Sequence, residues 1–180
     1  MVILGIDPGL VATGYGVAET LPEGLRVVTA GDIRPPRSVP LPERLAFIHD
    51  GLARLVAAHH PDTVVLEQLF THAHHVTTAT LMGHARGIAC LVAQEHGLPL
   101  AEYPPTHVKK SLTGNGHASK EQVARMVGQW LHHESACRAG REASWSADAT
   151  DALALAIVHA HTMAQRRNLV ITSDQIPSSK

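Results

Sequence analysis

Apolar residues along this chain follow two patterns, which are short continuous runs and longer stretches with a spacing of three and four. Continuous runs bounded by Gly, Pro or Asp are typical of buried strands, whereas the wider spacing indicates amphipathic helices. The expected strands cover residues 2–7, 14–19, 25–33, 63–67 and 98–104. The expected helices cover residues 43–59, 76–95, 105–112, 119–132 and 146–166.

The order of these elements predicts the fold. Short links rich in Gly and Pro join the first three strands, which favours antiparallel neighbours, and the last two strands belong to βα units. Together they predict an α/β protein with a mixed five-stranded sheet flanked by helices, an order that matches the ribonuclease H-like fold. We expect a single domain over residues 1–166 and a flexible tail over residues 167–180.

Composition fits one globular domain and gives some indication of its compartment. The chain has 180 residues, of which 44% are hydrophobic, enough for a sizeable core. Its two cysteines, Cys90 and Cys137, suit a reducing cytoplasm better than a disulfide framework. The N-terminus lacks a basic leader segment, and no apolar run approaches the roughly 20 residues of a membrane helix. We therefore expect a cytoplasmic protein without a membrane partner.

Charge is distributed unevenly although its net value is only −1. Residues 1–70 hold 5 Lys and Arg against 8 Asp and Glu, a balance of −3. Residues 104–141 hold 6 against 2, a balance of +4. A basic segment beside an acidic one suits an enzyme that acts on nucleic acid, but an ordinary solvated surface gives the same pattern.

Two buried strands end in carboxylates, and this is the first sign of chemistry. Asp7 follows the apolar run 2–6, and Glu67 follows the run 63–66. Burying an unpaired polar group costs on the order of 2–7 kcal/mol, so each carboxylate needs compensation. Asp-Pro-Gly is also ordinary turn chemistry, and a glutamate at a strand end can reach solvent. In the predicted sheet the two strands are neighbours, so Asp7 and Glu67 come close together.

Asp148 and Asp151 add two more carboxylates on one face of the last helix. Acidic residues in a first helical turn also favour the helix dipole, and Ser146 is a plausible N-cap. Four clustered carboxylates repel one another unless a cation lies among them. Oxygen-only ligands suit Mg²⁺ or Mn²⁺, and two such ions can promote phosphodiester hydrolysis. On this interpretation Asp7 holds metal, and Pro8 and Gly9 leave room for a phosphate.

Five segments in this order resemble the RuvC Holliday-junction endonucleases. They cover about residues 1–163 and read "GIDPGLVATGYGV", "LEQLF", "GHARGIACL", "VKKSLTGNGHASKEQV" and "ADATDALALAIVHAH". The resemblance implies a homodimer that cuts four-way junction DNA symmetrically and works with the RuvA and RuvB branch-migration proteins. It implies Asp7, Glu67, Asp148 and Asp151 as catalytic residues and ligands of Mg²⁺ or Mn²⁺, two ions per site.

The resemblance also suggests DNA contacts. It places Lys109 and Lys120 on backbone phosphate and Phe70 beside the site. A departure from the family pattern follows Phe70, where "THAHHVTT" stands in place of the usual Lys or Asn, and His117 occupies a position that is often basic. The expected DNA-facing histidines are His72, His74, His75 and His117.

Alternative interpretations stay open on the residues alone. The spacing His-x-His-His offers zinc no cysteine partner and no second ligand pair, so DNA-facing or surface histidines are favoured over a zinc site. The opening stretch also resembles the first phosphate loop of actin-like ATPases, but no second glycine-rich loop follows. A non-catalytic nucleic-acid-binding module would need the basic segment without the four carboxylates.

A two-fold junction also favours a two-fold protein, because one active centre cuts one strand. Helix 76–95 is the expected dimer contact, since its small residues allow close approach. These residues are Ala79, Gly83, Ala85, Gly87 and Ala89.

Overall fold

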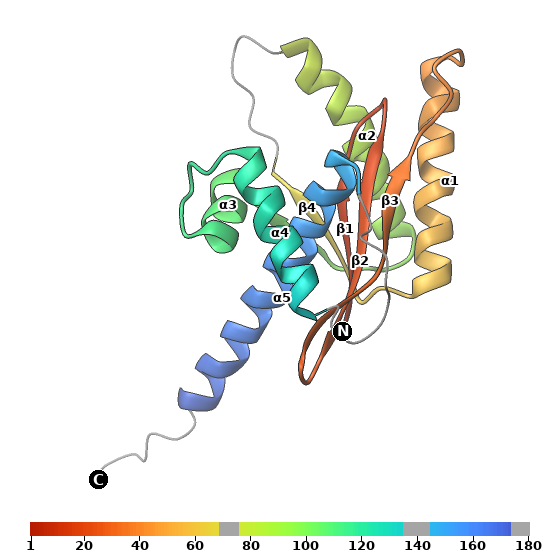
Figure 1. Ribbon diagram of the computed structural model, residues 1–180. Coiled ribbons are helices and arrows are strands. Elements are labelled where there is room, and N and C mark those ends of the chain that lie inside the picture. Colours follow the sequence, from red (N-terminus) through yellow and green to blue (C-terminus); the bar gives the residue numbers. More distant parts are fainter. Residues whose placement is uncertain (69–75, 135–144, 174–180) are drawn as a thin grey trace.

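A five-stranded sheet with helices on both faces forms the body of the protein in the computed structural model, which describes residues 1–68, 76–134 and 145–173 (Figure 1). The strands are β1 Val2–Asp7, β2 Thr13–Leu21, β3 Gly24–Ile33, β4 Thr63–Glu67 and β5 Leu100–Tyr103. The helices are α1 Leu41–His59, α2 Val76–Glu95, α3 Pro105–Thr113, α4 Lys120–Glu134 and α5 Ala147–Ser173.

The strand order is β3-β2-β1-β4-β5, with β1 at the centre. Strand β2 pairs antiparallel with β1 and β3, whereas β4 pairs parallel with β1 and β5. The predicted mixed five-stranded sheet is therefore confirmed. This order places the ends of β1 and β4 side by side, because Ile6 of β1 aligns with Leu66 of β4.

Element boundaries lie within two residues of the expected ones except at the end of α5, and two of the differences have a clear cause. Strand β2 runs to Leu21 rather than to residue 19, because its pairing with β3 continues to the tight turn at Gly24. Helix α5 runs to Ser173 rather than to residue 166, since no Gly or Pro interrupts residues 147–173. In Figure 1 its last turns project away from the sheet.

Each face of the sheet has its own core. Leu4, Ile6 and Val17 point to the face that α1 and α2 cover, where Ile48 and Leu52 of α1 are fully buried. The opposite face is covered by α3, α4 and α5 (Figure 1). Helix α5 lies at the centre of that face, and its residues 152–160 are all buried.

Helix α5 touches the backbone of β1 and β2 directly, because glycines stand beneath it. A methyl group on Gly5 would lie 2.1 Å from the carbonyl oxygen of Ala152. One on Gly14 would lie 2.0 Å from the carbonyl oxygen of Asp148. Only glycine permits this approach, which fixes the N-terminal part of α5 over the end of β1.

Helix α2 packs differently from the way its small residues suggested. Ala85 and Ala89 are buried against the chain's own sheet, so they are not open to a second copy. Gly83 and Gly87 are exposed, and a methyl group added to either would have no neighbouring atom within 4 Å. No helix within the described ranges is long and apolar enough to span a membrane.

The contact between α5 and β1 predicts the effect of Gly5→Ala. The added methyl group meets the main chain of Ala152, so strand and helix must move apart. We expect a loss of about 3 kcal/mol in the free energy of unfolding, measured by urea denaturation, as for severe overpacking.

Gly128→Ala in α4 is the matched control. Nothing lies within 4 Å of the position that its methyl group would take. We expect the free energy of unfolding of this variant to rise by about 0.5–1 kcal/mol, since alanine is a better helix former than glycine. Equal stability of the Gly5→Ala and Gly128→Ala variants would contradict the close contact between α5 and β1.

Candidate active site

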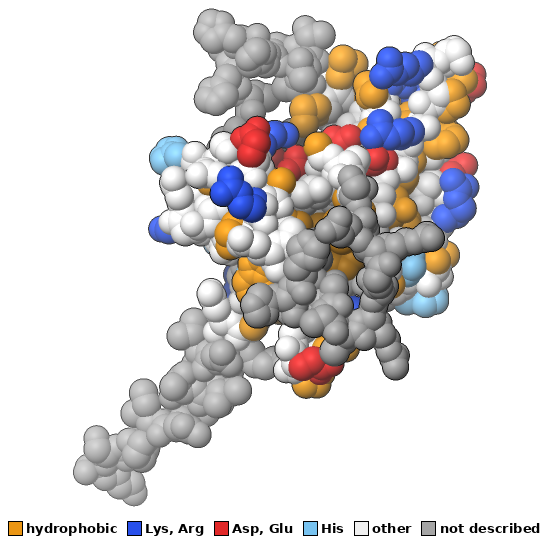
Figure 2. All heavy atoms as spheres, viewed as in Figure 1, with side chains coloured by type: hydrophobic (Ala, Val, Ile, Leu, Met, Phe, Trp, Pro, Cys, Tyr) orange, Lys and Arg blue, Asp and Glu red, His pale blue; other side chains and the backbone are white. Residues whose placement is uncertain are grey.

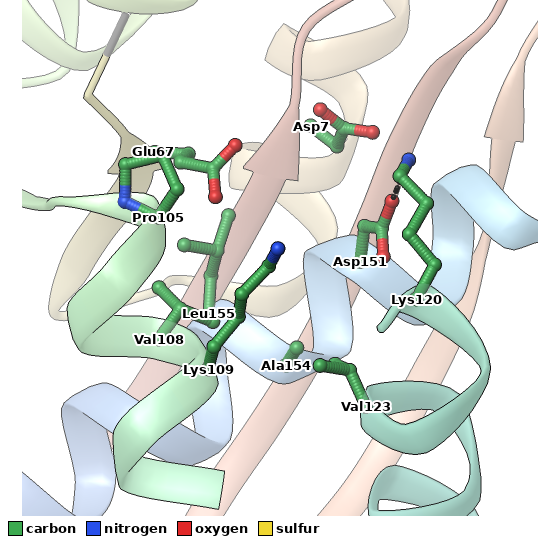
Figure 3. Close-up of a pocket in the computed structure, with 10 residues that line it drawn as sticks. All are labelled: Asp7, Glu67, Pro105, Val108, Lys109, Lys120, Val123, Asp151, Ala154 and Leu155. Atoms are coloured by element: carbon green, nitrogen blue, oxygen red, sulfur yellow. Dashed lines mark hydrogen bonds and ion pairs between the residues drawn. The ribbon is translucent and has the colours of Figure 1, made fainter. Parts of the chain in front are cut away.

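A pocket of about 200 Å³ opens at the carboxyl ends of β1 and β4. Five charged side chains from five different elements point into it, and Figure 3 shows them around one opening. Val108, Val123, Ala154 and Leu155 form its apolar wall. The charged side chains are Asp7 of β1, Glu67 of β4, Lys109 of α3, Lys120 of α4 and Asp151 of α5.

Asp7 ends β1, and the turn after it is held locally. The hydroxyl of Thr13 donates to the carbonyl oxygen of Gly9 at 2.8 Å, and the Gly9 N–H lies 3.3 Å from the same hydroxyl. A methyl group on Gly9 would lie 2.3 Å from the carbonyl oxygen of Ala12. The conformation of the turn therefore requires glycine at this position, independently of any room it leaves for a phosphate.

Glu67 ends β4 just beyond the last residue that pairs with β1. Its carbonyl oxygen accepts a hydrogen bond from Nη1 of Arg86 at 2.6 Å. The following N–H, of Gln68, donates to the carbonyl oxygen of Tyr103 at 2.8 Å. The backbone that carries the Glu67 side chain is thus tied to both α2 and β5.

Asp148 and Asp151 lie in the first turns of α5, as the sequence predicted. The hydroxyl of Ser146 accepts a hydrogen bond from the Ala149 N–H at 3.0 Å, so Ser146 is the N-cap. Asp151 lines the pocket, and Nζ of Lys120 lies 3.2 Å from its Oδ2. Asp148 does not line the pocket, and its Oδ2 lies 3.8 Å from Nη2 of Arg34.

Burial and mutual repulsion change the acidity of these carboxyl groups. Burial, followed by the charges of Asp151, Asp148 and Glu67, raises the pKa of Asp7 from 3.8 to about 7. Burial and the charge of Asp151 also raise the pKa of Glu67. The charge of Asp151 raises the pKa of Lys120 in turn, so this ammonium group stays charged beside the acids.

This donor set fits a hard divalent cation by its chemistry. Asp7, Glu67 and Asp151 offer only carboxylate oxygens, the ligands that Mg²⁺ and Mn²⁺ prefer. Burial, together with the charges of the neighbouring carboxylates, raises the pKa of Asp7, and Lys120 offsets only part of this effect. Among the described residues, however, no three His, Cys, Asp or Glu side chains are grouped tightly enough to hold one ion as they stand.

The predicted DNA contacts fall into three groups. Lys109 and Lys120 both line the pocket. His117 is exposed in the turn between α3 and α4, outside the pocket lining, where its N–H donates to Oδ1 of Asn115 at 2.9 Å. Figure 2 shows acidic side chains on this face with Lys and Arg side chains on either side. Phe70, His72, His74 and His75 lie outside the described residues.

Three residues around the site were not singled out from the sequence. Asp32 of β3 accepts hydrogen bonds from the Ser146 hydroxyl at 2.6 Å and from Arg34 at 2.7 Å. This network ties the end of β3 to the start of α5. Arg86 was missed as well, although a charge between Ala85 and Gly87 in a helix of small and apolar residues was a usable signal.

The family model described as "Crossover junction endodeoxyribonuclease RuvC" matches residues 3–159. A protein of that name from Halorhodospira halophila is 46% identical over 159 residues, which are 88% of this chain and 89% of the relative. One from Allorhizobium ampelinum is 44% identical over 165 residues, 92% of each chain.

Solved structures agree with these sequence matches. The structure described as T. thermophilus RuvC in complex with Holliday junction substrate superposes with a TM-score of 0.77 at 31% identity. The alignment covers 92% of this chain and 96% of that one. The yeast mitochondrial Holliday junction resolvase Ydc2 superposes with a TM-score of 0.62 at 14% identity. The alignment covers 92% of this chain and 80% of that one, and the likeness shows a shared fold alone.

The raised pKa of Asp7 predicts how stability depends on pH when no divalent metal is present. The folded-state pKa, about 7, lies above the ordinary 3.8, so the folded state holds the proton more tightly than the unfolded state. The stability that this tighter proton binding adds to the folded state is fully present below pH 4 and is lost as the pH rises through 7. In EDTA, we expect Asp7→Asn to be more stable than wild type at pH 8, by at most about 4 kcal/mol.

Urea unfolding of both proteins at pH 5, 6, 7 and 8 measures this difference. Glu23→Gln, in the exposed turn between β2 and β3, is the control and should follow the wild-type pH profile. A stability difference between Asp7→Asn and wild type that stays constant from pH 5 to 8 would show that Asp7 does not titrate in this range.

Proposed function

Because the chain belongs to the crossover junction endodeoxyribonuclease RuvC family, we propose that it resolves four-way DNA junctions by paired, symmetric phosphodiester hydrolysis. The observation that carries the proposal is the convergence of Asp7, Glu67 and Asp151 on one pocket from β1, β4 and α5. Lys109 and Lys120 stand at the same pocket and can attract a phosphate. A module that only bound nucleic acid would not need the three carboxylates.

In this proposal, Asp7, Glu67, Asp148 and Asp151 hold Mg²⁺ or Mn²⁺, two ions per site. Membership of the family itself suggests dependence on divalent metal. Bound metal ions would activate the attacking water and stabilise the leaving oxygen of the phosphodiester. Asp148 would turn from Arg34 toward the pocket, a side-chain movement that its half-exposed position permits.

The chain's own residues have further tasks in the reaction. Lys120 keeps its proton at Nζ because Asp151 raises its pKa, so it supplies positive charge to the phosphate. Lys109, on the other side of the opening, supplies a second positive charge (Figure 3).

The remaining expected contacts are also part of the proposal. Phe70, His72, His74 and His75 follow Glu67 closely in the chain, so we assign them to the DNA near the site. His117 would extend this surface along the turn between α3 and α4. RuvA and RuvB, the branch-migration proteins, are the proposed partners, and the cytoplasm is the proposed compartment.

Changing the carboxylates should separate binding from chemistry. Asp7→Asn, Glu67→Gln, Asp148→Asn and Asp151→Asn each remove one proposed metal ligand and leave the basic surface intact. We expect each to slow cutting by about 100-fold or more, while affinity for a four-way junction in EDTA stays within threefold of wild type. Asp50→Asn, on the exposed surface of α1, is the control. Near-full activity in any two of the four variants would exclude the four-carboxylate site.

The two pocket lysines should contribute to binding through phosphate. Lys109→Ala and Lys120→Ala are expected to weaken junction binding and to lower its salt dependence by about one unit of slope each. Lys110→Ala is a matched control, because Lys110 is exposed next to Lys109 on α3 but does not line the pocket. Slopes equal to that of the Lys110 variant would show that neither lysine contacts DNA.

We further propose a homodimer, because two opposed cuts require two active centres in register. The exposed glycines Gly83 and Gly87 offer α2 as the contact, whereas Ala85 and Ala89 are occupied within the chain. Sedimentation should give a dimer at micromolar concentration, and Gly87→Leu should shift it toward monomer with loss of paired cuts. Gly128→Leu, on α4, should leave the dimer intact. A fully active monomer would contradict the dimer.

A further inference from the structure

Arg86 is a charged residue at a largely enclosed position of α2. Its side chain is only 16% exposed, and its neighbours Ala85 and Ala89 are buried. One guanidinium nitrogen, Nη1, donates to the carbonyl oxygen of Glu67, and the other, Nη2, pairs with the carboxylate of Glu102 on β5. Enclosing a guanidinium is costly unless its hydrogen bonds are made, so this position has a specific structural purpose.

The carbonyl that Arg86 holds belongs to Glu67, the last residue of β4, which pairs with Tyr103 of β5 on one side but has no partner on β1. Pairing between β1 and β4 ends at Leu66, so β1 does not fix the backbone of Glu67. The peptide that joins Glu67 to Gln68 is held at both of its polar groups. Its carbonyl oxygen accepts from Arg86, and its N–H donates to the carbonyl oxygen of Tyr103. Together these two bonds set the orientation of the peptide that follows the Glu67 Cα.

We propose that Arg86 is a positioning residue for the reaction, which aims the Glu67 carboxylate into the pocket by clamping the end of β4. Arg86 does not line the pocket, so it acts through the Glu67 backbone rather than on DNA. It also joins two features of the molecule, since α2 carries the exposed Gly83 and Gly87 and β4 carries Glu67. The effect on cutting rests on the proposed function, whereas the effect on metal binding is separate.

Three substitutions separate the clamp from its ion pair. Arg86→Met keeps the aliphatic bulk but removes both donors. Arg86→Lys keeps the charge and one donor group. Glu102→Gln weakens the ion pair and leaves the bond to the Glu67 carbonyl. Each is compared with wild type for Mn²⁺ affinity of the DNA-free protein, junction affinity in EDTA, and single-turnover cutting.

We expect Arg86→Met to lower Mn²⁺ affinity and the cutting rate by about 10–100-fold, the usual effect of losing a group that orients a metal ligand. Junction affinity in EDTA should not change, because no proposed DNA contact is altered. Arg86→Lys should recover part of the lost Mn²⁺ affinity and cutting rate. Glu102→Gln should keep both within about threefold of wild type.

Urea unfolding of every variant controls for loss of structure. If Arg86→Met does not fold, the double variant Arg86→Met/Glu102→Gln takes its place, since it also removes the unpaired carboxylate. A folded variant without Arg86 that keeps wild-type Mn²⁺ affinity would overturn the proposal, as would a Glu102→Gln defect equal to that of Arg86→Met. If wild type cuts no junction, the proposed function fails, while the Mn²⁺ comparison still tests Arg86.

Discussion

The direct contact between helix α5 and the backbone of β1 and β2 is the constraint on which the site depends. Gly14 pairs with Asp7 in the sheet and also lies beneath the main chain of Asp148. The same few residues therefore hold a strand-end carboxylate and the acidic first turns of a helix together. At Gly5 and Gly14 no side chain lies between strand and helix, so no rotamer change can alter their separation there. The main-chain contact thus sets the spacing of the Cα atoms that carry these carboxylates.

Electrostatic repulsion opposes the close approach of the carboxylates that this packing imposes. The carboxyl groups of Asp7, Glu67 and Asp151 face one partly enclosed pocket, and their repulsion adds to the cost of burial. Lys120 offsets part of that cost through its ion pair with Asp151, and Arg34 lies near Asp148. Folding has to overcome the remainder, which a chain with a neutral pocket would avoid. Such a locally unfavourable cluster is typical of a site kept for function rather than for stability.

Much of this architecture was predictable because the sequence patterns are local and strong. Buried runs ending in Asp7 and Glu67 indicated two strand ends, and the spacing of Asp148 and Asp151 indicated one helix face. The N-cap role of Ser146 followed from the same stretch, and its hydrogen bond to the Ala149 N–H is present. What the pattern could not supply was the distance between layers, because Gly5 and Gly14 look like turn or strand-breaking residues until a helix lies above them.

Long-range polar contacts were equally hidden. The bond from Arg86 to the Glu67 carbonyl spans 19 residues, and that from Ser146 to Asp32 spans 114. Neither has a periodic signature, since a backbone carbonyl carries no side-chain identity. Two of the small residues on α2 were misleading for a related reason. Composition marks where a helix can approach another surface closely, but Ala85 and Ala89 use that capacity within the chain.

The glycines beneath α5 also differ in how freely their positions can change over generations. At Gly5 and Gly14 the obstructing atoms are main-chain atoms, which every amino acid has, so no second substitution on α5 can make room. At Gly16 the two nearest atoms belong to the side chain of Leu153, and a smaller residue there would leave only the Leu153 Cα, 3.0 Å away, in close contact. Gly16 can therefore exchange together with Leu153 and a slight shift of the helix, whereas Gly5 and Gly14 have no compensating partner and are fixed as long as the helix stays in place.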